Sequence, residues 1–387
     1  MPLIYNLRHL LVRKVSTLLT ALGIALVVFI FTSMLAFVQG LRGALVATGR
    51  PENVIVMRGG ATAEVQSYVP RDDAALIRGA PEVARDAAGE PLVSSDLVVI
   101  VNHPKRGGGE PTNVNVRGVG PQAFALRPDV RVVEGRAFRP GLAEVMVGRA
   151  LSRRISDTGL GDRIRLGGQS WEVVGIFEAG GSSYESEIWG DAELCLPAFD
   201  RPGYQSVTFR LADPASFDAV KHRLEEEPQL EVQVQRESDY YRRQSQGMAS
   251  LLRALSVFIA VIMSIGAVSG ALNTMYAAVG SRTREIGTLL AIGFTPGSIL
   301  RSFLFESVLV AGAGGVIGAL LALAVANGRS TGTTNWNAFS ELTFRIAVTP
   351  GVIATGLLFA VLMGLVGGLW PARRAARLQV AEAVRSV

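Results

Sequence analysis

The chain has 387 residues, of which 49% are hydrophobic and only 18% are charged. Soluble domains carry about 25% charged residues, so this composition argues against a purely soluble protein and favours membrane spans. The net charge of +5 is spread along the chain without a basic patch interleaved with aromatic residues, so we expect no nucleic-acid partner. The single cysteine, Cys195, excludes an internal disulfide framework.

The first long apolar run covers residues 15–41 and contains no charged residue. Arg8, Arg13 and Lys14 precede it in a short N-terminal segment, residues 1–14. The apolar core of a signal peptide is only about 7–15 residues long, and no small-residue cleavage motif stands at the end of this run. The pattern predicts an uncleaved transmembrane helix.

A segment of mixed composition, residues 42–248, follows the first span and is long enough for an α+β domain. Runs rich in Val, Ile and Phe predict strands, and two amphipathic segments, each followed by Pro, predict helices. We expect two lobes and an exposed polar loop at residues 182–187. The predicted strands cover residues 53–57, 97–102, 113–118, 163–166, 171–177 and 206–211, and the predicted helices cover 72–79 and 216–227.

Both helices that flank this domain are expected to run past the bilayer. The first span continues as an amphipathic pattern toward Gly49, and the second begins near Ser238 with no Pro to stop it. Two helices that enter one domain can form a stalk that carries movement to it, which is a hypothesis about mechanism.

Three further apolar runs, residues 254–280, 303–327 and 346–370, each exceed the roughly 20 residues that a bilayer requires. The predicted fold is a membrane protein with four transmembrane α-helices and a large α+β extracytoplasmic domain inserted between helices 1 and 2. No Asp, Lys or Arg lies mid-span, and Glu306 lies near an end of the third run. This pattern argues against a proton- or ion-coupled carrier.

Flanking charges predict the orientation of the chain. Basic residues outnumber acidic ones in the N-terminal segment, in the loop at residues 281–302 and in the tail at residues 371–387. The count for the tail includes Arg385 and Glu382. By the positive-inside rule these segments are cytoplasmic, whereas the short loop at residues 328–345 and the domain at 42–248 lie outside. We therefore expect a multi-pass protein among membrane lipids, and in a two-membrane bacterium this places the chain in the inner membrane with its large domain in the periplasm.

Motifs of catalysis are missing from the sequence. His9, His103 and His222 lack the spacing of metal ligands. Neither the G-x-S-x-G nucleophile elbow nor the phosphate-binding G-x-x-x-x-G-K-[ST] motif occurs. We predict no catalytic residue, no metal site and no cofactor bound directly by the chain, so its energy source has to lie elsewhere.

Pairs of glycines recur in the last three spans with the G-x-x-x-G spacing that lets helix backbones approach closely. This spacing predicts helix packing, either within the chain or across a homodimer. The pairs are Gly266 and Gly270, Gly314 and Gly318, and Gly364 and Gly368.

The loop between the second and third spans contains Arg284–Gly293, REIGTLLAIG, which predicts a short helix. Its apolar residues share one face by the i, i+3, i+4, i+7 spacing. Such a helix between two spans suits a groove on another protein, and an interfacial helix lying on lipid is the alternative. The apolar face comprises Ile286, Leu289, Leu290 and Gly293, and the charged residues at its entry are Arg282, Arg284 and Glu285.

Residues 281–307, SRTREIGTLLAIGFTPGSILRSFLFES, closely resemble a segment of the MacB/FtsX/LolC-like ABC transporter permeases. The tail WPARRAARLQVAEAVRS resembles that family's ending, in which a Pro-Ala-Arg-Arg-Ala-Ala motif leaves the last span. In the outer region, GRAF at 135–138, EVMVGRALSRR at 144–154 and residues 160–166 and 171–177 resemble the MacB-like periplasmic core domain.

The resemblance implies a homodimer, or a pair of related permeases, with two copies of a cytoplasmic ATPase that binds ATP and Mg. On this resemblance residues 282–293 form the coupling helix, and ATP-driven movement of that helix rocks the stalk and the outer domain, which is called mechanotransmission. The chain lacks the ATPase domain of fused MacB, so we expect the motor on a separate chain. It also has fewer spans than the ten-span members.

The family leaves several functions open. The leading expectation is export of a peptide, lipid, glycolipid or toxic compound with a periplasmic adaptor and an outer-membrane channel. One alternative is lipoprotein extraction, as in LolC/LolE-type permeases. Another is an FtsX-like scaffold that activates a cell-wall hydrolase, although the outer domain of such scaffolds is typically much smaller than residues 43–247. An enzyme is the weakest option because no catalytic constellation occurs.

Overall fold

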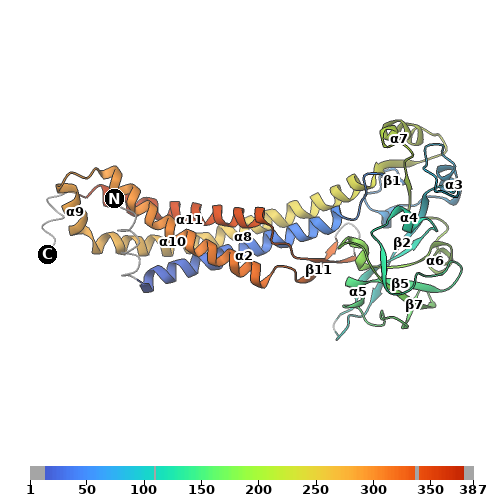
Figure 1. Ribbon diagram of the computed structural model, residues 1–387, viewed down its shortest axis with the longest axis horizontal. Coiled ribbons are helices and arrows are strands. Elements are labelled where there is room, and N and C mark those ends of the chain that lie inside the picture. The colour runs from blue at the N-terminus through green and yellow to red at the C-terminus, as the bar shows by residue number, and fades with distance from the viewer. Residues whose placement is uncertain (1–13, 109, 336–339, 379–387) are drawn as a thin grey trace. The chain divides into compact units, whose positions relative to one another are not determined.

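The computed structural model describes residues 14–108, 110–335 and 340–378. The chain divides into two compact units (Figure 1). The helical unit comprises Met1–Gln39, Ser250–Arg329 and Ile346–Val387, and the sheet unit comprises Gly40–Ala249 and Ser330–Arg345. Arg8, Arg13, Glu382 and Arg385, which contribute to the predicted orientation, lie outside the described residues.

Among the described residues, four helices are long and apolar enough to cross a membrane. They pack side by side in the helical unit (Figure 1) around Ile24, Val28, Ala311, Ala360 and Met363. The four predicted spans fall largely within them. The helices are α2 (Lys14–Val46), α8 (Glu237–Ser281), α10 (Pro296–Val325) and α11 (Pro350–Ala376).

Helices α10 and α11 begin with the same three residues, Thr-Pro-Gly. The side chain of Thr295 accepts a hydrogen bond from the amide of Ser298, and that of Thr349 accepts one from Val352, so each Thr caps its helix. Proline suits the first helical position because it has no amide hydrogen to satisfy. Helix α11 therefore starts at Pro350, later than the predicted span start at residue 346.

Glycines mark the closest approaches between these helices. A Cβ built on Gly314 or Gly318 would overlap backbone atoms of α2, and one built on Gly364 or Gly368 would overlap Ser307 or Ala311 of α10. By contrast, no described atom from outside the local helix lies within 4 Å of a Cβ built on Gly266 or Gly270 of α8. Two of the three predicted pairs thus lie at helix–helix contacts of the described chain.

The described part of the sheet unit contains one ten-stranded sheet with the order β10-β1-β9-β2-β3-β8-β5-β7-β4, and β6 pairs with β7. The strands on one side of the β2–β3 hairpin are β1 (Asn53–Arg58), β9 (Ser206–Arg210) and β10 (Val232–Arg236). The hairpin strands are β2 (Val93–His103) and β3 (Thr112–Val119). The others are β4 (Arg131–Gly135), β5 (Glu144–Gly148), β6 (Arg163–Leu166), β7 (Gln169–Glu178) and β8 (Glu187–Asp191).

Alternating side chains place a core on each face of the sheet. In β1, Val54 and Val56 join the larger core, whereas Ile55 and Met57 join the smaller one. Helices α3 (Arg71–Arg78), α5 (Arg149–Ser152), α6 (Ala192–Ala198) and α7 (Phe217–Glu225) contribute to the larger core. Helix α4 (Ala123–Leu126) and the start of α8 contribute to the smaller one.

All six predicted strands and both predicted helices of this unit are confirmed, with ends shifted by a few residues. The strands hydrogen-bond into one sheet within one compact unit, and the expectation of two lobes stays a prediction. The expected exposed loop at residues 182–187 is wrong. It forms the short 3-10 helix η2 (Ser183–Ser186) and the start of β8, where Ser182, Tyr184, Ser186 and Glu187 are buried.

The predicted short loop between α10 and α11 contains a hairpin, β11 (Ser330–Asn335) and β12 (Ser340–Arg345), whose strands pair antiparallel. It belongs to the sheet unit. Buried Leu342, Thr343 and Phe344 show that β12 packs into this unit and is not a free loop.

Both flanking helices continue into the sheet unit, since α2 supplies Gly40–Val46 and α8 supplies Glu237–Ala249. The chain passes close to itself there, because a Cβ built on Gly49 would overlap the backbone of Glu237. The predicted extension of these two helices beyond their apolar runs is confirmed.

Candidate functional site

The predicted coupling segment forms helix α9 (Thr283–Ala291) between α8 and α10. Its end is sharp because Gly293 adopts a φ of +100°, in the region that favours glycine. The amides of Gly293 and Phe294 donate hydrogen bonds to the carbonyls of Leu290 and Leu289, both over 3.1 Å. Helix α9 is therefore a short rigid element with a defined exit.

The inner face of α9 packs within the helical unit. Ile286 is only 2% exposed, and Leu290 is partly buried against the same cluster. Ile286 of the predicted apolar face therefore already fills a site between the chain's own helices and is not open to a partner. The cluster comprises Met275, Val279, Ile286, Ile299, Phe303, Ala372 and Ala375.

The outer face of α9 and the turn after it are exposed. Ile292 is 71% exposed and Phe294 is 39% exposed, while Arg284 and Gly293 are also open and Leu289 is half-buried. Sequence reasoning missed Ile292 and Phe294 because it followed helical spacing. The available signal was that both are large apolar residues in a turn, where polar residues are usual.

A buried ion pair fastens the start of α9 to α10. The Nη1 atom of Arg282 lies 3.3 Å from Oε2 of Glu306, and its Nε atom lies 3.1 Å from Oε2 of Glu285. The guanidinium of Arg282 also lies over the ring of Phe303, 5.2 Å from its centroid. Glu306 is thus a partner of the predicted coupling segment. Burial raises the pKa of Glu285 above its ordinary value.

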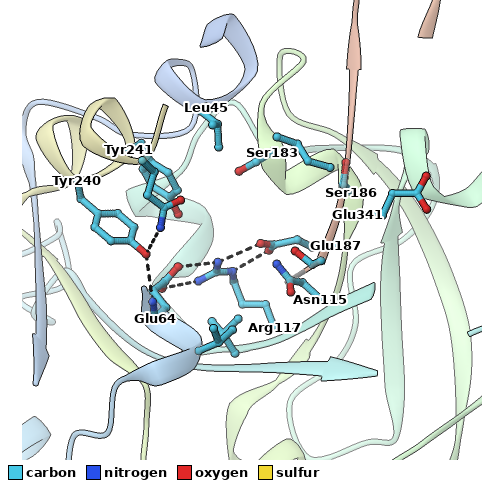
Figure 2. Close-up of a pocket in the computed structure, with 15 residues that line it drawn as sticks. Leu45, Glu64, Asn115, Arg117, Ser183, Ser186, Glu187, Tyr240, Tyr241 and Glu341 are labelled. Atoms are coloured by element: carbon cyan, nitrogen blue, oxygen red, sulfur yellow. Dashed lines mark hydrogen bonds and ion pairs between the residues drawn. The ribbon is translucent and has the colours of Figure 1, made fainter. Parts of the chain in front are cut away.

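A second polar cluster lies around a pocket of the sheet unit (Figure 2). Arg117 of β3 stands between two carboxylates, with Nε 2.7 Å from Oε2 of Glu187 and Nη1 2.8 Å from Oε1 of Glu64. Figure 2 shows both pairs, with Tyr240 of α8 beside Glu64. The Tyr240 hydroxyl accepts a hydrogen bond from the Glu64 amide over 3.1 Å.

The same cluster reaches the first residue of α8. Arg127 donates to Oδ2 of Asp96 over 2.7 Å and to the Tyr184 hydroxyl over 3.0 Å. The Tyr184 hydroxyl in turn donates to Oε1 of Glu237 over 3.1 Å, and the Asn53 side chain donates to Oε2 of Glu237 over 2.9 Å. Hydrogen bonds from Asn53 of β1 and Tyr184 of η2 therefore hold the start of α8.

Electrostatics favour the ionised form of Glu64 despite its burial. Burial alone would raise the pKa of Glu64, but the Arg117 guanidinium holds it below its ordinary value. Burial raises the pKa of Tyr184, so its hydroxyl stays protonated and can donate. Among the described residues, no group of three or more His, Cys, Asp or Glu side chains could hold a metal ion. The cluster is suited to structural support of α8.

Comparison with known proteins identifies the chain's relatives. The family model described as the MacB-like periplasmic core domain matches residues 17–227, and the one described as the FtsX-like permease C-terminal matches residues 257–380. The chain belongs to the MacB/FtsX-like family of ABC transporter permeases. This confirms the resemblance seen in the sequence, and the four long apolar helices fit a multi-pass membrane permease with an extracellular domain.

Curated relatives of this permease match most of its length. It is 25% identical to the macrolide export ATP-binding/permease protein MacB 2 of Yersinia pestis over 96% of this chain and 56% of that one. It is 29% identical to the pyoverdine export ATP-binding/permease protein PvdT of Pseudomonas entomophila over 98% and 58%. The uncharacterized ABC transporter permease YknZ of Bacillus subtilis is 26% identical over 71% of each chain. The chain spans little more than half the length of MacB 2 and PvdT.

Among solved structures, the extracellular domain of YknZ from Gram-positive bacteria aligns with a TM-score of 0.37 and 15% identity. The alignment covers 47% of this chain and 99% of that domain.

Proposed function

We propose that this chain is the permease subunit of an ABC transporter, and that α9 receives movement from a separate cytoplasmic ATPase present in two copies, which binds ATP and Mg. The observation that carries the proposal is the construction of α9. Its inner residue Ile286 is buried, its start is fastened to α10 through Glu306, and Ile292 and Phe294 remain exposed beside it. A short helix that is fixed on one face and followed by an exposed apolar turn suits a groove on a partner.

The permease would perform work outside the membrane by mechanotransmission. Helix α8 ends at Ser281, directly before α9, and begins at Glu237 in the polar cluster of the sheet unit. Because α8 is one continuous helix between these points, a displacement of α9 would displace Glu237 as well, with no flexible linker between them. Cargo would then need no route across the inner membrane.

The proposed cargo is a peptide, lipid, glycolipid or toxic compound, exported with a periplasmic adaptor and an outer-membrane channel. The names of relatives that export macrolides or pyoverdine support this class. A homodimer in the inner membrane, with the sheet unit in the periplasm, is part of the proposal. The open space beside Gly266 and Gly270 of α8 supports a second copy at that face.

The test is mild-detergent purification of the chain from its native cell, followed by mass spectrometry of the proteins that accompany it. An ATPase with a periplasmic adaptor would support export. An ATPase with a related second permease would favour lipoprotein extraction, and one with a cell-wall hydrolase would favour a signalling scaffold. Absence of any ATPase would contradict the role assigned to α9.

A double variant tests the docking face directly. Ile292→Asp with Phe294→Asp should reduce ATPase recovery at least about tenfold, because two charges would have to be desolvated in an apolar contact. The matched control is Leu142→Asp, at an exposed apolar residue of the sheet unit, which should leave recovery unchanged. Equal recovery from the double variant and the control would argue against this face.

A further inference from the structure

The β11–β12 hairpin is held to the rest of the sheet unit by a charged residue of its second strand. This residue is Glu341, which is only 8% exposed. Its buried carboxylate is paired with groups of the surrounding domain. The Thr112 hydroxyl donates to its Oε2 over 2.8 Å, and Lys105 Nζ lies 3.7 Å from the same oxygen. Arg154 forms an ion pair with its other oxygen, Oε1. Three segments of the domain therefore converge on one side chain of the hairpin.

The partner strand of the hairpin leaves room for this pairing. Gly332 of β11 would, with a Cβ, overlap the guanidinium of Arg154 and the carboxylate of Glu341. A glycine at this position thus allows the Arg154 side chain to reach across β11 to β12.

Two further contacts fix the same hairpin. The Thr343 amide donates to the Ser186 hydroxyl over 2.8 Å, and that hydroxyl donates back to the Thr343 carbonyl over 3.3 Å. Figure 2 shows Ser186 beside the strand that carries Glu341. At the end of β12, a Cβ built on Gly40 of α2 would overlap the carbonyl oxygen of Arg345. The hairpin therefore contacts η2 and α2 as well as β3.

We propose that the β11–β12 hairpin is an electrostatic latch through which α10 and α11 act on the outer domain, with Glu341 as its positioning residue. The chain enters the hairpin from α10 and leaves it into α11, so a latched hairpin gives these helices their own attachment to the domain. An isolated two-stranded hairpin is marginally stable in water, so its order depends on these contacts. The transport role rests on the proposed function, whereas the latch itself does not.

The latch is tested with the full chain in lipid nanodiscs, without any partner, by hydrogen exchange with mass spectrometry. In Glu341→Gln, the amides of residues 330–335 and 340–345 should exchange about tenfold faster, because the hairpin loses its ion pair with the half-buried Arg154. Arg154→Gln should have the same effect from the other side of the contact. The control is Glu90→Gln, at an exposed carboxylate of the same unit. Wild-type exchange in both Glu341→Gln and Arg154→Gln would overturn the latch.

The transport role is tested in the complex with the ATPase. Glu341→Gln should keep wild-type ATPase recovery and ATP hydrolysis but lose at least about tenfold in cargo release. Faster exchange of the hairpin with wild-type cargo release would overturn the mechanical role and leave only a structural contact. Failure of the wild-type chain to recover an ATPase would instead count against the proposed function, while the exchange result would still decide the latch.

Discussion

Arg117 is the residue on which most of the buried charge in the sheet unit depends. Its guanidinium contacts Glu64, Glu187 and Asp96, and all four side chains are nearly inaccessible to water. A buried charge that loses its partner is strongly destabilising, whereas an intact cluster is of modest net benefit. The cluster therefore imposes a specific arrangement on the strands and on η1 (Glu64–Gln66), which together surround the start of α8.

Arg117→Met should lower the stability of the sheet unit by about 3–5 kcal/mol, because up to three carboxylates lose their counter-charge. Thermal unfolding of the full chain in detergent, followed by circular dichroism in the β-sheet region, measures the change. Arg163→Met is the control, since Arg163 is exposed on β6 and its loss should change stability by less than about 0.5 kcal/mol. Similar unfolding of the two variants would show that the cluster does not hold the unit together.

The depressed pKa of Glu64 predicts a pH dependence with a definite sign. A carboxyl whose folded pKa lies below its unfolded value contributes stability above the unfolded pKa and loses it as pH falls through the folded pKa. The ordinary pKa of a Glu side chain is 4.5, and that of Glu64 lies below it. The stability gap between wild type and Glu64→Gln should thus be full at pH 6 and shrink toward pH 3. A gap that is constant or that widens on acidification would contradict this assignment.

At the scale of elements, the sequence predicts a helix or strand when the residues of that segment themselves have the composition or spacing typical of it. Strands β1, β3 and β9 are rich in β-branched and aromatic residues, so local composition is enough to find them. Strand β8, EIWGD, contains two acidic residues and a glycine, so its sequence is typical of a loop. It nevertheless pairs with β3 and β5, and Arg117, 70 residues earlier, compensates the burial of Glu187. Such a partner is visible only in the fold.

The same reasoning applies to the functional elements. Helix α9 could be predicted because its apolar residues follow helical spacing, and Arg282 was recognised as part of it. Which face would remain exposed could not be predicted, because that depends on the packing of Ile286 against Phe303 and Ala372. The β11–β12 hairpin was missed as a packed element, since Glu341 is stabilised by residues far away in sequence.

The contacts between helices predict different effects on stability when a glycine is replaced in two of the G-x-x-x-G pairs. Gly318→Leu should destabilise the helical unit by about 1–3 kcal/mol or more, because a side chain there overlaps the backbone of α2. Gly266→Leu should leave the unfolding of the monomeric chain unchanged, since no described atom beyond its own helix lies near that position. Thermal unfolding in detergent checks both. A loss of cross-linked dimer in Gly266→Leu alone would locate the second copy at this face, and equal destabilisation by both variants would contradict the packing.

At the scale of the whole molecule, α8 is the longest single element, with 45 residues. At 1.5 Å per residue it is about 68 Å long, and it contributes to both compact units. A continuous helix of this length transmits displacement along its axis, because its backbone hydrogen bonds resist stretching. Under the proposed function, coupling through α8 would depend on its continuity more than on any one contact.

Ala249→Pro should interrupt this continuity, since proline removes a helical hydrogen bond and kinks the helix. We expect ATPase recovery to be retained and cargo release to fall at least about tenfold. Gly247→Ala, nearby in the same helix, has open space around it and should leave cargo release intact. Wild-type release in Ala249→Pro would show that work reaches the outer domain by another route.

The shared Thr-Pro-Gly start of α10 and α11 has a consequence for how these helices can move. A helix with an uncapped end can fray, and a pull on the adjoining segment is then absorbed by unwinding the first turn. Thr295 and Thr349 close the first turns of α10 and α11. A pull that reaches either helix from α9 or from the β11–β12 hairpin would therefore tilt or slide that helix as a rigid body.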